Sequence, residues 1–131
     1  MNNLQVEVLN KLREIVDEYE ELITRIKYYK QLIRAEPESL SDLLSSIEAI
    51  YNRTVDFFEE YNGIKIDNDE MHRYIRAYLA YLKLISIPYT AELLSDIKNL
   101  IERQFSDRFS KEVGKIADIT ERLKLLSETN S

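Results

Sequence analysis

The sequence predicts an all-α protein: an elongated antiparallel four- to five-helix bundle with a long N-terminal helix, forming one domain over residues 1–131. Apolar residues recur at alternating steps of four and three along residues 8–33, which is the spacing of one helix face. The chain has only two glycines and two prolines, which favours few, short connections. Because a helix of roughly thirty residues is about 45 Å long, the other helices must lie along it.

The first helix is expected over Asn3–Ala35. Its acids precede its bases, an order that suits the helix dipole. Glu36-Pro37 should end it, because the residue before a proline is pushed out of the α region. The expected core stripe of this helix consists of Val8, Leu12, Ile15, Tyr19, Leu22, Ile26, Tyr29 and Ile33.

A second helix is expected from an N-cap at Ser39 to Asn62-Gly63, where glycine is the usual C′ residue. Its apolar stripe has one polar member, since Thr54 stands where an apolar residue is expected. The segment Ile64–Ile66 is too short to found a sheet. We interpret it as an extended connector between helices.

A third helix should begin at Asp67 as N-cap, with Glu70 completing a capping box. Pro88 should end it, and Thr90 should cap the next helix. The residues expected to face the core are Met71, Tyr74, Ile75, Tyr78, Leu82 and Ile85.

The last part of the chain allows two interpretations. Apolar residues from Leu93 to Val113 step by four, and each such step turns the stripe about 40° around a helix. A straight helix would carry the stripe to its opposite side, so we expect a break near Ser106-Asp107 and a separate last helix. The alternative is a single long helix over Ala91–Leu126 that touches two surfaces.

No motif for catalysis accompanies these helices. The chain has no cysteine, and its only histidine, His72, has Asp69 three residues before it but no Glu-x-x-His partner of the kind found in bundle metal sites. Neither a glycine-rich phosphate loop nor a nucleophile elbow is present in the sequence. We therefore predict a protein that is not an enzyme, with no cofactor and no metal.

Two basic groups suggest partner surfaces instead. The first lies late on the first helix, and the second lies on the side of the third helix away from its expected core stripe, among alanines and aliphatic residues. The alternative interpretation of the second group is that the third helix is central and that its arginines extend past neighbouring helices to pair with the excess of acids. The candidate residues are Lys27, Lys30 and Arg34 in the first group, and Arg73, Arg76, Ala80, Lys83, Leu84 and Ile87 in the second.

Charge and hydropathy restrict the class of partner. The net charge is −6, which disfavours attraction of the whole surface to nucleic acid and leaves a protein partner or a homo-oligomer as the expectation. The most apolar window, Tyr74–Ile87, contains two cations and is shorter than the ~20 residues of a membrane span. The first residues lack the pattern of a classical secretion signal, so we expect a cytoplasmic or virion protein.

The composition, rich in Lys, Glu, Ile and Tyr and free of Cys, is typical of thermophiles. With the stretches TRIKYYKQLIRAE and YIRAYLAYLKLISIPYT, it resembles small all-helical structural proteins of virions from hyperthermophilic crenarchaeal viruses. The resemblance implies a structural or assembly role. The alternative function is a helical scaffold subunit of a nucleic-acid-processing complex, of the replication or CRISPR type.

Overall fold

The computed structural model describes residues 3–32, 39–62, 68–104 and 109–128, and these are almost entirely helical. Five sequence expectations lie outside the described residues: the end of the first helix at Glu36-Pro37, the Gly63 cap, the connector Ile64–Ile66, the cap at Asp67 and the break near Ser106-Asp107. The helices are α1 (Asn3–Leu32), α2 (Ser39–Asn62), α3 (Asp69–Tyr81), the π-helical turn η1 (Leu82–Ser86), α4 (Ile87–Gln104) and α5 (Ser110–Glu128).

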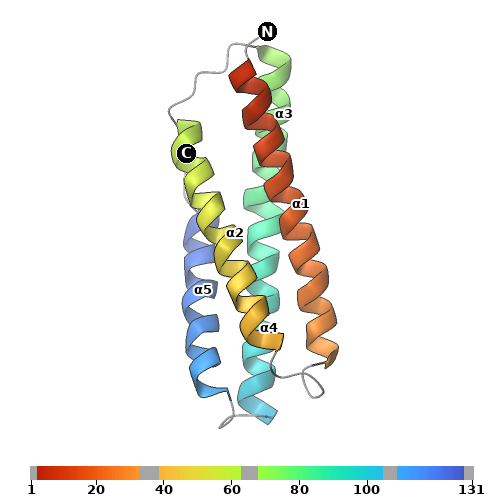
Figure 1. Ribbon diagram of the computed structural model, residues 1–131, viewed down its shortest axis with the longest axis vertical. Helices are drawn as coiled ribbons and strands as arrows, with labels where there is room; N and C mark the ends of the chain where they lie inside the picture. Colours follow the sequence, from red (N-terminus) through yellow and green to blue (C-terminus); the bar gives the residue numbers. More distant parts are fainter. Residues whose placement is uncertain (1–2, 33–38, 63–67, 105–108, 129–131) are drawn as a thin grey trace.

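The helices form an elongated bundle of four rods, in which α3, η1 and α4 make one continuous rod (Figure 1). Rods that follow one another in the chain run in opposite directions. Around the bundle, α1 contacts α2, α2 contacts α5, α5 contacts α4, and the α3–η1–α4 rod contacts α1. The predicted class, an all-α antiparallel bundle with a long N-terminal helix, is confirmed.

The apolar stripe of α1 forms one side of the core. Each of its predicted members from Val8 to Tyr29 is buried, and Ile33 lies outside the described residues. Buried side chains of α2, α3, α4 and α5 join this stripe in one apolar cluster that runs through the bundle. The helix-period pattern of α1 and α2 therefore corresponds directly to burial, because each of these two helices has a single apolar face.

The expected end of the third helix at Pro88 is wrong. The chain continues from α3 into α4 through η1, where the backbone N–H of Ile87 donates to the carbonyl of Leu82, five residues earlier. Proline lacks an N–H, and the wider π turn accommodates this loss. Thr90 is not an N-cap either: it is buried inside the rod, and its hydroxyl donates to the carbonyl of Ser86 at 2.8 Å.

The core face of this rod also differs from the expected one. Tyr74 and Ile85 were expected to face the core, but they are 54% and 48% exposed. Leu79, which the predicted stripe omitted, is buried, and Ile87 is completely buried instead of lying on the outer side. The π turn shifts the helical phase by about one residue, so the core side of the rod after it differs from the side that plain α-helical spacing predicts.

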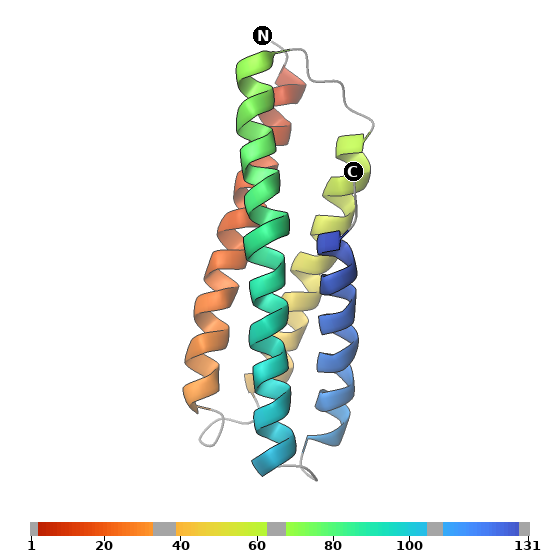
Figure 2. The ribbon, with the colours of Figure 1, turned by 180° about the vertical axis from the view of Figure 1, so that it is seen from behind.

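The two ends of the α3–η1–α4 rod have different surroundings. Asn68 is the N-cap of α3, and its side-chain oxygen accepts a hydrogen bond from the N–H of Met71 at 2.8 Å. At the other end, α4 and α5 are separate helices packed on each other, as the two-helix interpretation predicted. Figure 2 shows that α5 ends well below the top of α3, so within the described residues α5 contacts α4 and η1 but not α3.

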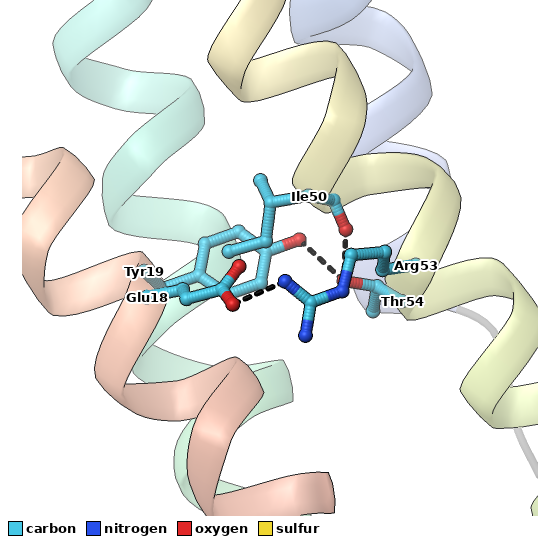
Figure 3. Close-up of polar contacts among 5 residues, drawn as sticks. All are labelled: Glu18, Tyr19, Ile50, Arg53 and Thr54. Atoms are coloured by element: carbon cyan, nitrogen blue, oxygen red, sulfur yellow. Dashed lines mark hydrogen bonds and ion pairs between the residues drawn. The ribbon is translucent and has the colours of Figure 1, made fainter.

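A buried pair of hydroxyls joins α1 to α2 inside the core (Figure 3). The hydroxyl of Thr54 donates to the carbonyl of Ile50 at 2.7 Å, and its oxygen lies 3.0 Å from the hydroxyl of Tyr19. Because the single proton of Thr54 is used by Ile50, Tyr19 is the donor to Thr54. Burial raises the pKa of Tyr19 well above its ordinary value. At the surface beside this pair, Arg53 and Glu18 form an ion pair between the same two helices.

We predict that Leu82→Ala lowers the free energy of unfolding by about 2–5 kcal/mol, because Leu82 is completely buried. The matched variant Leu84→Ala should change it by less than about 0.5 kcal/mol, because Leu84 is 71% exposed. Chemical denaturation followed by circular dichroism measures both. Equal losses in the two variants would contradict the observed orientation of the rod.

We also predict that Thr54→Val costs about 1–3 kcal/mol of stability, because it leaves the buried Tyr19 hydroxyl without an acceptor. The double variant Tyr19→Phe/Thr54→Val should recover part of this loss. Thr54→Ser, which keeps the hydroxyl, should avoid most of it.

The folded protein holds Tyr19 in its neutral form. The contribution of Tyr19 to stability is therefore present below pH about 10 and is lost as the pH rises further. Between pH 8 and pH 11, Tyr19→Phe should lose about 1.4 kcal/mol less than the wild type, measured by denaturation at each pH. Equal alkaline losses would contradict this assignment.

Candidate protein-binding surface

The side of α3 and η1 opposite the core carries a row of exposed apolar residues. We call this surface the α3–η1 outer face. Leu84 is 71% exposed and Tyr81 is 40% exposed, while the alanines between the large side chains are small enough for close approach of a partner. The outer face consists of Arg73, Tyr74, Arg76, Ala77, Ala80, Tyr81, Leu84 and Ile85, all of which are exposed.

A shallow groove separates one flank of this face from α1. It is lined by Val16, Asp17, Glu20, Ala77, Tyr78 and Tyr81. The hydroxyl of Tyr81 donates to a carboxylate oxygen of Glu20 at 2.9 Å, and this bond and the charge of Glu20 raise the pKa of Tyr81. The groove therefore has an apolar floor and an acidic rim, and the hydrogen bond sets α3 in register with α1.

The opposite flank is cationic. The ammonium of Lys83 lies 5.2 Å from the ring centroid of Phe58 on α2, and partial burial lowers the pKa of Lys83. Arg76 lies seven residues earlier on the same side of the rod. Within the described part of the chain, the guanidinium groups of Arg73 and Arg76 make no ion pair or hydrogen bond, so both are available to a partner.

The first predicted basic group does not form a free surface. Lys27 stands over the ring of Tyr89, at 5.0 Å from its centroid, and Lys30 pairs with Asp96 at 3.5 Å. Both lysines therefore link α1 to α4. Arg34 lies outside the described residues.

The second predicted group is largely brought together. Arg73, Arg76, Ala80 and Leu84 share the outer face. The prediction that Ile87 belongs to this surface is wrong. Ile87 is completely buried, because the π turn directs it into the core. Lys83 is partly covered by its contact with Phe58, so it borders the outer face without belonging to its centre.

Sequence reasoning did not place the acidic rim beside the third helix. The acids of Glu14–Glu21 were expected to match the helix dipole and to lie opposite the cations of a second copy, and two of them, Asp17 and Glu20, are three residues apart on one side of α1. Their spacing was a usable signal. Their position beside Tyr81 was not, because it depends on the register between α1 and α3.

Two other kinds of site are not found among the described residues. No three His, Asp or Glu side chains of the described ranges lie together in a way that would hold a metal ion. None of the helices described has both the length and the apolar character needed to cross a membrane. The arrangement of the outer face is suited to binding, through apolar contact at its centre and charged contact at its edges.

A scan of protein-family models and searches of curated proteins and of solved structures return no match to this chain.

Proposed function

We propose that this protein is a non-enzymatic interaction protein that binds other protein through the α3–η1 outer face. The observation that carries the proposal is the exposure of Tyr74, Tyr81, Leu84 and Ile85 on one rod whose other side supplies the core. A helix with two apolar sides has one side more than its own fold uses. Contiguous exposed apolar surface of this kind is typical of protein-binding sites.

The composition of the face fits this role. Apolar surface that leaves water contributes about 25 cal/mol per Å² before the costs of association. Tyrosine and arginine are enriched in protein interfaces. The outer face has two of each: Tyr74, Tyr81, Arg73 and Arg76. Ala77 and Ala80 between them allow the backbone of a partner to approach closely.

The setting that we propose is a virion or its assembly, with the protein as a structural component. The support for this setting is the resemblance of the sequence to small helical proteins of archaeal virions. A bundle of long helices that binds protein through one side, the α3–η1 outer face, suits repeated packing in an assembly.

The test uses the double variant Ala80→Glu/Leu84→Lys. Because both residues are exposed, the variant should keep the helical circular dichroism spectrum and the melting temperature of the wild type. Its protein binding should fall at least tenfold in a native pull-down from purified virions or source cells, because two charges would be placed against an apolar partner. Tyr28→Glu, which alters an equally exposed aromatic residue on α1, should bind as the wild type does. Undiminished binding by a folded double variant would refute the proposal.

A second candidate function, a scaffold subunit of a nucleic-acid-processing complex, is favoured by one observation. Arg73 and Arg76 are exposed and unpaired in the described part of the chain, as cations that contact phosphates would be. Filter binding of duplex and single-stranded DNA across a salt series separates the two functions. We expect weak binding with little salt dependence, since the net charge is −6 and Asp17 and Glu20 form the other edge of the same face. Tight binding that falls steeply with salt, and that Arg73→Gln/Arg76→Gln removes, would favour the second candidate.

A further inference from the structure

The two flanks of the α3–η1 outer face carry opposite charges at the same height along the bundle. The hydrogen bond from Tyr81 to Glu20 aligns the parallel helices α3 and α1. Asp17, one turn before Glu20, therefore lies level with Ala77 and Tyr78, with which it lines the groove. Arg76 projects at this same height from the other side of the rod. An apolar row thus separates an acidic edge from a basic edge.

We propose that the occupant of this face is a second copy of the chain, related by a two-fold axis parallel to the long axis of the bundle; this inference rests on the protein-binding function proposed above. Such an axis exchanges the two flanks. The acidic edge of each copy, Asp17 and Glu20, then faces Arg76 of the other copy. Arg73, one turn earlier, lies beside the same edge. Both edges of the interface are thereby matched in charge.

The other way to pair two copies through this face is disfavoured by the same charges. A two-fold axis perpendicular to the rods would make them antiparallel, and each flank would meet its own counterpart. Arg76 would then approach the basic edge of the second copy, and Asp17 with Glu20 would approach its acidic edge. Like charges brought together at an interface oppose association, so the surface is self-complementary only in the parallel arrangement.

The apolar row has the spacing that a parallel contact between helices requires. Tyr74, Ala77, Tyr81 and Leu84 follow one another at steps of three, four and three, which is the spacing of a coiled-coil seam. In the parallel pair each residue of the row meets its own copy across the axis. Ala77 is the smallest of them, and at its height the two backbones can approach most closely.

Cysteine cross-linking tests this geometry without interference, because the natural chain contains no cysteine. In the parallel dimer, Ala77→Cys and Leu84→Cys should each form a disulfide with the same residue of the second copy under mild oxidation. Cα atoms more than about 7 Å apart cannot be bridged without backbone movement. The two sites are about 10 Å apart along the rod, so in an antiparallel dimer at most one of them can lie near enough to the axis to pair with itself. Tyr28→Cys, equally accessible but on α1, is the matched control and should stay monomeric on a non-reducing gel.

Charge exchange provides the second readout. Arg76→Glu should weaken dimerisation at least tenfold in sedimentation at low salt. Asp17→Arg in the same chain should restore it, because the charges of the pair are then reversed.

Cross-linking at only one of the two sites, or failure of the second substitution to restore the dimer, would overturn the parallel two-fold. A wild type that stays monomeric at high concentration also overturns the inference. If the Ala80→Glu/Leu84→Lys variant still loses its pull-down partners in that case, the protein-binding function stands and only the second copy is wrong.

Discussion

The burial of one continuous apolar stripe on α1 is the interaction on which the rest of the structure depends. This helix contacts α2, α3, η1 and α4, so it sets the length of the bundle and the height at which each residue of the other rods lies. The buried pair of Tyr19 and Thr54 fixes the register of α2 against this stripe, since sliding either helix would strand a hydroxyl in the core. On the other side of α1, the hydrogen bond that Tyr81 donates to Glu20 marks the register of α3 against α1.

The sequence was sufficient to predict the class of fold, the long first helix, and the buried faces of α1 and α2. Each of these helices has one apolar side, so periodicity and burial coincide. The same reasoning misplaced the α3–η1–α4 rod for two physical reasons. Pro88 ordinarily ends a helix, and a π turn that absorbs it leaves no local sequence signal. The rod also has apolar residues on two sides, so its pattern did not distinguish the core side, with Leu79, from the exposed side, with Tyr74.

The candidate surface shows the same division between what is local and what is not. Residues that share one side of a helix, such as Arg73, Ala80 and Leu84, could be grouped from spacing alone. Whether a cation is free depends on what stands opposite it. Lys27 and Lys30 are engaged by Tyr89 and Asp96, which are more than sixty residues further along the chain. Such contacts follow from the packing of α1 against α4, and no pattern within α1 could have revealed them.

The π turn also has an evolutionary consequence. A single turn of this kind differs from a regular α-helix by about one residue, and one residue corresponds to about 100° of rotation. Loss of one residue within Leu82–Ser86 would therefore turn α3 by roughly a quarter of a circle relative to α4. The exposed row of Tyr74, Ala77, Tyr81 and Leu84 would turn towards a neighbouring helix while the composition of the chain hardly changed. A single codon deletion would therefore change which residues the rod exposes, a far shorter path than replacement of the surface residue by residue.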